Sequence, residues 1–452
     1  MYRVNNNWLQ RLAIFYLFIL PLVPRYIGLE VGDAPFLSVL RIATILLLLA
    51  WLLWSLFLTS EEAVGFRPGF SSPIYHARVL VLLYLFIMLV SVIFSHDITT
   101  SLKYFLSERV FVGVLAFFCF HSVFRRSNMI DIVLKVWLIS AVIVLFIGLF
   151  DLLIGRSVFS LVELPGKREM MEGFLQVKQR AGFMRVQSTL DNPVTLSTYL
   201  LMTFPIVVYF FNKTPSVVGK VAYGVLLWLV MGVLLLTFVR SAWFFMFLSI
   251  VILLRSKYLY LVLSGFVVLM ALVIGEGSGF GVSEKADTVT KSIVLQEERQ
   301  VSKSTVYRIE MLVAGFETLK ASPFTGVGPG NFGSEVEGDY FGERINFEHH
   351  ENYYITALVE TGILGFGAYL FMVSGVIRMI WKARKNEIYC KKKSLYTVIL
   401  LSMSNYLGMG FFVDSFSYFQ ISFLFWLLVA IALIMVENNN RGVKYFKLSR
   451  NL

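Results

Sequence analysis

Residues 131–154 read DIVLKVWLISAVIVLFIGLFDLLI, an apolar run of the length that a helix needs to cross a bilayer. Hydrophobic residues make up 57% of the 452-residue chain, and charged residues make up 15%. Soluble domains contain about 45–50% apolar and about 25% charged residues. The composition therefore predicts a membrane protein and excludes an ordinary cytosolic enzyme, a disordered chain and a disulfide scaffold.

We expect an all-α polytopic protein with about twelve membrane-spanning helices, because about 20 mostly apolar residues make one span. The spans are predicted near residues 8–24, 37–59, 77–95, 102–122, 131–154, 194–211, 221–238, 241–255, 258–275, 352–380, 394–413 and 416–436. The first run lacks a small-residue cleavage site, so we expect it to be retained. Cys119 lies in an apolar stretch, whereas Cys390 lies among lysines. These positions predict neither a disulfide nor a zinc site.

An even number of spans places both termini on one side of the membrane. The densest basic short loops fall on that side, at residues 125–126, 213–220, 255–257, 382–393 and 441–450. Short basic loops are typical of the cytoplasmic side, so we expect both termini there. The excess of 40 Lys and Arg over 29 Asp and Glu then reflects orientation and lipid phosphate, and nucleic acid is not an expected partner.

The predicted chain has three parts. Residues 1–275 hold nine spans and an external loop at about 156–192, residues 276–351 form a long external segment, and residues 352–452 hold three spans and a basic cytoplasmic tail. In the external segment, apolar residues recur at helical spacing at Val306, Ile309, Leu312, Val313, Phe316 and Leu319. This spacing predicts an amphipathic helix from Ser304 to Ser322 that lies over the membrane domain.

Arginines near the external side are the first candidate ligands. Arg180 and Arg185 precede a helix-start signal at residues 191–193, and Arg240 lies between two apolar runs. The guanidinium fork suits phosphate, and an arginine near membrane depth is costly enough to suggest a function. The alternatives are interfacial anchoring beside lipid headgroups for Arg180 and Arg185, and snorkelling at the end of a span for Arg240.

Two further external segments carry polar groups. Arg308 precedes a Gly-rich turn at residues 323–332, where the N–H groups of Gly328 and Gly330 could approach an anion, although a purely structural turn is the alternative. His349 and His350 then precede the tenth span. The spacing His-Glu-x-x-His is missing here, so we expect no metal. A histidine at a helix N-terminus favours the neutral form, which can accept a proton, whereas the alternative is an interfacial hydrogen-bonding histidine.

Together these residues resemble the O-antigen ligase and O-antigen polymerase superfamily. The resemblance rests on the order and spacing of Arg308-Ile309-Glu310, the turn from Pro323 to Phe332, His350 with Asn352, and the segment 359–365. It implies a GT-C-like glycosyltransferase of the bacterial inner membrane, with a large periplasmic segment between the ninth and tenth spans. Such enzymes take a glycan from undecaprenyl diphosphate on the periplasmic face, need neither nucleotide nor metal, and are thought to invert the anomeric centre.

The resemblance also implies roles for individual residues. Arg185 and Arg308 would hold the diphosphate, with Arg180 and Arg240 as secondary candidates, and His350 would accept the proton of the acceptor hydroxyl. Here the sequence departs from the usual pattern of His directly before Asn, because Glu351 stands between them. His349 or Glu351 is therefore an alternative base. The remaining predicted substrate-binding residues are Asn352, Gly328 and Gly330.

Ligation of a glycan to the lipid A core is the leading functional hypothesis. A polymerase, which passes the glycan to another lipid-linked repeat unit, is the close alternative, and a protein O-oligosaccharyltransferase is the third. A transporter of lipid-linked glycans would also use a basic cavity, but it would need access from both sides. A non-catalytic membrane scaffold would be insensitive to changes at His350 and Arg308. Membrane lipids are expected to surround the chain in every case.

Overall fold

The computed structural model describes residues 7–29, 37–56, 73–106, 111–125, 129–161, 165–166, 168–180, 183–190, 192–253, 306–340, 343–347, 352–414 and 418–448. The helices of the first half are α1 (Asn7–Ile19), α2 (Val39–Leu56), α4 (Pro73–Ile93), α5 (Ile98–Leu106), α6 (Phe111–Phe124), α7 (Ile130–Ile154) and α8 (Arg168–Leu175), with a 3-10 turn at Val158–Leu161. The second half holds α9 (Pro193–Lys213), α10 (Val217–Leu236), α11 (Arg240–Leu253), a helix at 306–321, α14 (Phe332–Glu335), α15 (Tyr353–Asn386), α16 (Cys390–Met409) and α17 (Phe419–Leu448).

The described strands form three short antiparallel pairs outside the helical bundle. They are β1 (Gly28–Leu29) with β2 (Leu37–Ser38), β3 (Gln179–Arg180) with β4 (Phe183–Met184), and β5 (Glu337–Tyr340) with β6 (Glu343–Asn346). In the longest pair, Glu337 lies opposite Asn346 and Tyr340 lies opposite Glu343. The chain is thus a mostly helical, polytopic membrane protein.

Seven helices in the described residues are long and apolar enough to cross a membrane: Val39–Leu56, Tyr75–Ile93, Ile130–Ile154, Pro193–Lys213, Val217–Leu236, Tyr353–Asn386 and Phe419–Asn439. Each lies at a predicted span. Three shorter apolar helices (Trp8–Ile19, Gly113–Phe124 and Arg240–Leu253) lie at three more predicted spans, and α16 lies at the eleventh. The predicted span at 258–275 is outside the described residues, so the total of twelve stays a prediction.

The predicted span at 102–122 is wrong as a single helix, because it is divided between α5 and α6. Residues 107–110 between them lie outside the described residues. Residues 98–106 form a helix that is buried on one face only. Ser101 and Phe105 are buried, while Leu102 and Leu106 are exposed. α5 therefore packs beside the end of α4 instead of extending α6.

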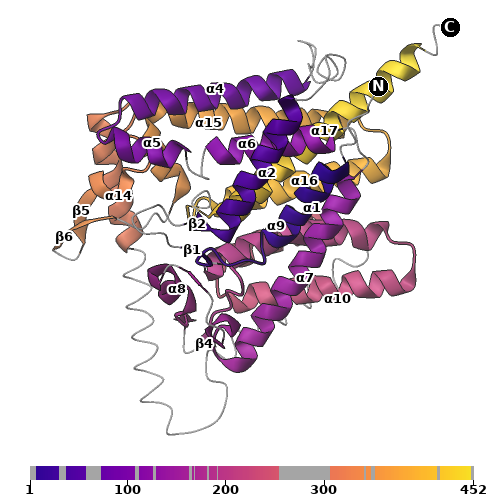
Figure 1. Cartoon of the computed structure of the whole chain (residues 1–452), viewed down its shortest axis with the longest axis horizontal. Helices are drawn as coiled ribbons and strands as arrows, with labels where there is room; N and C mark the ends of the chain where they lie inside the picture. The colour runs from indigo at the N-terminus through magenta and orange to yellow at the C-terminus, as the bar shows by residue number, and fades with distance from the viewer. Residues whose placement is uncertain are drawn as a thin grey trace.

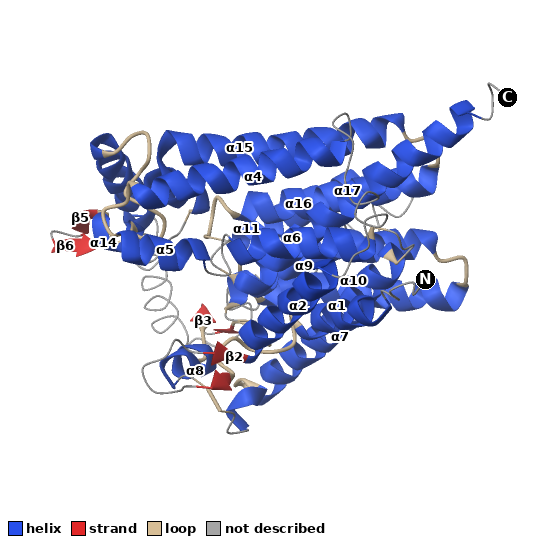
Figure 2. Ribbon diagram, turned by 45° about the horizontal axis from the view of Figure 1, so that its top comes forward, coloured by secondary structure: helices blue, strands red, loops and turns tan. Residues whose placement is uncertain are grey.

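Two helices form the centre of the bundle. α9 is buried on all sides over most of its length, and α17 is buried from Phe419 to Glu437. A helix that is hydrophobic all round is typical of such a central position. α9 contacts α7, α10, α11 and α16, while α17 contacts α4, α6, α15 and α16. α4 and α15 lie side by side along one edge of the bundle in both views (Figures 1 and 2).

The loops separate into two ends of the bundle. We call one the loop end; of the residues that the structure describes, it contains 20–29, 37–38, 94–97, 155–161, 165–166, 168–180, 183–190, 192, 237–239, 322–340, 343–347, 352, 410–414 and 418, and hydrogen bonds join several of these segments. Gly28 N–H donates to Pro165 O, His96 N–H to Val327 O, and Val186 N–H to Leu236 O. Figure 1 shows β5, β6, α14 and α8 at this end, whereas α17 runs toward the other end.

The opposite end, which we call the basic end, holds buried and half-buried ion pairs. The Arg125 guanidinium donates to both carboxylate oxygens of Glu437, joining α6 to α17, and the Lys213 ammonium donates to Asp131, joining α9 to α7. Both Arg125 and Glu437 are less than a tenth exposed. Charged side chains at membrane depth are expected to be paired in this way.

Candidate functional site

The Gly-rich turn inserts into a break in α15. At Gly362 the backbone is non-helical, with φ 63° and ψ −173°, so α15 loses two internal hydrogen bonds there. The N–H groups of Ile363 and Leu364 donate instead to Pro323 O and Phe324 O, at 2.9 and 3.2 Å. The α15 carbonyls that these N–H groups no longer reach accept bonds from the turn. Val327 N–H donates to Val359 O, and Gly328 N–H donates to Glu360 O. Four bonds to the turn thus replace the two that a continuous helix would form between these N–H and C=O groups.

Close backbone contact explains why the turn and the break contain glycine. Gly362 and Gly326 both have positive φ, which only glycine adopts without strain. A Cβ on Gly362 would lie 2.3 Å from the carbonyl of Phe324, and one on Gly326 would lie 2.4 Å from Glu360 C. These two residues therefore fix how the turn seats on α15.

The other glycines of the turn face α4 and α5. A Cβ on Gly328 would lie 2.0 Å from Ser95 Oγ, and one on Gly330 would lie 2.9 Å from the Tyr104 side chain. The Asn331 amide donates to Ser95 Oγ at 2.8 Å and to Val327 O at 3.0 Å. Because the N–H of Gly328 is bonded to Glu360, these contacts favour the structural alternative for this turn. No sequence pattern had pointed to Ser95 or Tyr104.

Asn352 caps the start of α15, two residues after His350. Its side-chain oxygen accepts from the N–H groups of Tyr354, at 2.9 Å, and Ile355, at 3.3 Å, which is the expected geometry of an N-cap. Tyr353 N–H donates to Gly410 O, and the Tyr354 hydroxyl donates to Leu407 O at 2.6 Å. The start of α15 is therefore fixed against the end of α16. His349, His350 and Glu351 lie outside the described residues.

Arg185 is positioned by the turn that precedes Arg240. The Arg185 Nε donates to Thr237 O at 2.9 Å, and the Phe183 and Phe238 rings stack at 5.9 Å. Arg240 is exposed at the first position of α11, three residues after Thr237. Arg180 belongs to β3, paired with Phe183, and its side chain lies outside the described residues. The structure thus gathers the backbones of Arg180, Arg185 and Arg240 around one turn.

The turn between α16 and α17 contacts both α11, the helix that begins at Arg240, and the start of α15. The Phe245 ring of α11 lies 6.4 Å from the Phe412 ring, and the Tyr354 ring of α15 lies 4.3 Å from the Phe411 ring. The aromatic pair at 411–412 is therefore a shared neighbour of α11 and α15. Sequence reasoning missed it, because two phenylalanines at the end of an apolar run carry no distinguishing signal.

Arg308 lies on the helix at 306–321, where its side chain is exposed. This helix was predicted, but the face that packs on the protein is not the predicted apolar stripe. Met311 and Ala314 are buried with Val327, Phe332 and Val359, while Ile309, Val313 and Phe316 are about half exposed. The small residues Ala314 and Gly315 allow close approach to α15, where a Cβ on Gly315 would lie 3.2 Å from Ile355.

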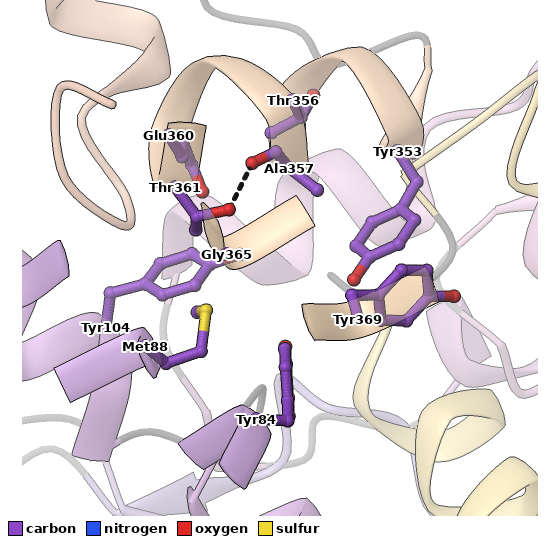
Figure 3. Close-up of a pocket in the computed structure, with 10 residues that line it drawn as sticks. All are labelled: Tyr84, Met88, Tyr104, Tyr353, Thr356, Ala357, Glu360, Thr361, Gly365 and Tyr369. Atoms are coloured by element: carbon purple, nitrogen blue, oxygen red, sulfur yellow. Dashed lines mark hydrogen bonds between the residues drawn. The ribbon is translucent and has the colours of Figure 1, made fainter. Parts of the chain in front are cut away.

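A small pocket lies between α4, α5 and α15, beneath the start of α15. Its polar lining consists of Tyr84, Tyr104, Tyr353, Thr356, Glu360, Thr361 and Tyr369. Figure 3 shows Tyr84, Tyr104 and Tyr353 directed into this space from different sides. The Glu360 side chain is only 2% exposed, and its carbonyl is the one that receives Gly328. The pocket and the Gly-rich turn are therefore two sides of one assembly.

Comparison with known families adds one match, over residues 225–370. The matched family is O-antigen ligase. The match confirms the resemblance predicted from the residues of this region. The matched segment includes Arg240, Arg308 and the stretch from His349 to Asn352, whereas Arg180 and Arg185 precede it. Members of this family are ligases or polymerases of the glycosyltransferase type, which supports an enzymatic function. No curated protein matches the chain.

The structure also bears on the predicted absence of a metal. Among the residues that it describes, no group of three or more His, Cys, Asp or Glu side chains could hold a metal ion. His349 and His350 are not among them, so the expected metal independence stays a prediction.

Proposed function

We propose that the chain is a glycan ligase that transfers a glycan from undecaprenyl diphosphate to the lipid A core, on the periplasmic face of the bacterial inner membrane. The observation that carries this proposal is the O-antigen ligase match over 225–370, a segment that contains Asn352 at the loop end and Arg308 on the helix at 306–321. In this proposal the loop end is periplasmic, and both termini are cytoplasmic.

The arginines bind the leaving group. Arg185 and Arg308 hold the diphosphate, and Arg180 and Arg240 contribute to the same positive region. As the glycosidic bond breaks, negative charge grows on the diphosphate, and guanidinium groups stabilise this charge through paired hydrogen bonds. The Arg185 Nε bond to Thr237 O supports this role, because it fixes the orientation of the guanidinium before substrate binds.

The residues before α15 activate the acceptor. His350 accepts the proton of the acceptor hydroxyl while that oxygen attacks the anomeric carbon, and His349 or Glu351 is the alternative base. Asn352 supports this role by setting the first turn of α15 directly after these residues. The N-terminal end of that helix favours a neutral imidazole, which is the form that can take a proton. General-base catalysis of this kind contributes about 10²–10⁴-fold.

Transfer by the purified protein tests the proposal. The protein is incubated with an undecaprenyl-diphosphate-linked glycan in chelator, with and without rough lipopolysaccharide. Glycan on the lipid A core supports the ligase. Lengthening of the glycan on its carrier without lipopolysaccharide would instead identify a polymerase, and transfer to neither acceptor would contradict both. The His350→Ala variant is assayed in the same way. Its control is His76→Ala, which changes an exposed histidine of α4 near the basic end.

A further inference from the structure

One exposed face of α15 changes from apolar to basic along its length. Figure 1 shows α15 running from the loop end, beside α14, to the basic end. After the break at Gly362, helical spacing places four exposed apolar residues on this face: Ile363, Leu364, Leu370 and Phe371. Further along, the same face carries Arg378, Trp381, Lys382 and Lys385, all exposed. Such a change is typical of a helix that leaves the hydrocarbon of a bilayer.

The length of this face places its basic part beside lipid headgroups. At 1.5 Å per residue, Trp381 lies about 27 Å along α15 from Ile363, and Lys385 lies about 33 Å from it. The hydrocarbon of a bilayer is about 30 Å thick. Because Ile363 is the first exposed apolar residue after the break, Trp381 falls at the far edge of the hydrocarbon. Lys385 falls just beyond that edge, at the level of the phosphates.

The turn that follows holds many cations and one inward-facing carboxylate. We call residues 378–393 the basic turn; it contains seven basic residues, and Glu387 is the only acidic residue between Thr361 and Val413. Glu387 is 5% exposed, and its carboxylate accepts from Tyr389 N–H at 3.1 Å. Among the side chains that the structure describes, no carboxylate forms an ion pair with these basic residues. Their charge is therefore open to an anion from outside the chain.

Two aromatic rings order the cations of the basic turn. Arg384 Cζ lies 5.2 Å from the centre of the Trp381 ring, and Arg384 Nε donates to Thr397 Oγ1 of α16 at 2.7 Å. Lys392 Nζ lies 5.6 Å from the centre of the Tyr389 ring. Cation–π contacts of this kind hold a long side chain in place. An anion that binds here therefore meets cations whose conformations are already restricted, which lowers the entropy cost of binding.

The tip of the basic turn is apolar. Ile388 is 88% exposed and Tyr389 is 67% exposed, although a turn that faces only water is usually built from polar residues. At the level of the headgroups, these two side chains can contact the upper parts of acyl chains while the lysines contact phosphate. A soluble acidic partner would satisfy the lysines but would leave the exposed Trp381, at the edge of the hydrocarbon, without a role.

We propose that the basic turn is a binding site for an anionic phospholipid. Its phosphate is bound by the lysines of the turn, and its acyl chains lie against the apolar tip. A phosphatidylglycerol headgroup fits because each lysine near an anionic headgroup adds to its attraction, whereas a zwitterionic headgroup carries an ammonium that the lysines repel. The inference is independent of the proposed function, because it concerns neither the glycan donor nor the acceptor.

Photo-crosslinking in a mixed bilayer tests this preference. A photoreactive phenylalanine analogue replaces Tyr389 or, as the control, Val218, which is 81% exposed at the start of α10, also at the basic end. The turn before α10 is less basic, because Lys213 is paired with Asp131 and only Lys220 follows. In nanodiscs with equal phosphatidylglycerol and phosphatidylcholine, we expect phosphatidylglycerol to exceed phosphatidylcholine about tenfold among adducts at position 389 and to equal it at position 218.

Two results of this experiment would overturn the proposal. The first is the same lipid composition in the adducts at both positions, which would mean ordinary contact with the bilayer. The second is an adduct of position 389 with another protein or with residues 254–305 of the chain, which would mean that something other than lipid covers the basic turn.

Removal of charge provides the second arm. The triple variant Lys385→Gln, Lys392→Gln and Lys393→Gln should bring the preference at position 389 close to one, whereas Lys220→Gln should leave it unchanged. An unchanged preference in the triple variant would contradict the proposal. For the unmodified lysines, NaCl at about 0.5 M should weaken the preference by screening exposed charges. Sodium phosphate at equal ionic strength should act no more strongly, and stronger competition by it would identify a site for free phosphate instead of lipid.

Discussion

The backbone N–H of Gly328 donates a 2.9 Å hydrogen bond to the carbonyl oxygen of Glu360. This bond joins the Gly-rich turn to the break in α15, and it exists because Gly362 releases the Glu360 carbonyl from the helix. The turn, the break and the first turns of α15 therefore form one unit. The position of Asn352 depends on that unit.

Replacing Gly362 should destabilise the protein. Its φ and ψ are almost restricted to glycine, and such strain costs about 1–3 kcal/mol before the clash with the Phe324 carbonyl is added. We expect Gly362→Ala to lower the thermal unfolding midpoint in detergent by several degrees. Gly367→Ala is the matched control in the same helix, because a Cβ there meets nothing within 4 Å. Equal midpoints for the two variants would contradict this account of the break.

Removing the cap of α15 should impair transfer more than stability. Asn352→Ala deletes the acceptor for two backbone N–H groups and should cost about 1 kcal/mol. Because the first turn also positions the residues before it, we expect a clear fall in kcat, with Asn352→Ser restoring most of it. Ser216→Ala removes the cap of α10 at the basic end and should cost similar stability without loss of kcat. A normal kcat in Asn352→Ala would refute the positioning role.

Acidification should loosen the segment between α4 and α5. Hydrogen bonds from the Thr100 hydroxyl and from backbone N–H groups lower the pKa of Asp97 below its ordinary value of 3.8. Asp97 therefore stabilises the folded state while it is ionised, and this contribution is lost as pH falls below about 4. We expect Asp97→Asn to flatten the acid limb of the stability curve. Unchanged acid sensitivity in Asp97→Asn would show that other groups control it.

The buried pair at the basic end should behave non-additively. Arg125→Met or Glu437→Met alone leaves a buried charge without its main partner and should cost about 3–5 kcal/mol. The double variant should recover much of that loss, because both charges are then removed. Denaturation of the three variants, analysed as a double-mutant cycle, measures the coupling. Additive losses would mean that the two side chains act independently.

Much of the fold follows from the length of the apolar runs. Ten predicted spans coincide with apolar helices or with α16, since a run of about 20 apolar residues has few other stable states. The span at 102–122 was wrong because hydrophobicity alone does not distinguish a membrane span from a short helix packed on the surface. The direction that Phe105 faces depends on α4 and α6, and no local pattern contains that information.

The candidate site was harder to predict. Its glycines were recognised as a turn, but the partner of that turn, the break at Gly362, depends on contacts between distant segments. The helix at 306–321 was predicted from its apolar spacing. Its predicted apolar face nevertheless points outward, because Ala314 and Gly315 permit closer packing on α15. Small residues give almost no hydrophobic signal, although they decide which face of this helix is buried.

The most direct test of the account is the rate of glycan transfer under single-turnover conditions for His350→Ala, His349→Ala and Glu351→Ala. We predict that one variant, His350→Ala in our assignment, loses about 10²–10⁴-fold in the rate of the chemical step and retains its affinity for the donor. A large loss in His349→Ala or Glu351→Ala instead would move the base by one residue. Transfer at the wild-type rate in all three variants would contradict the claim that the residues before Asn352 activate the acceptor.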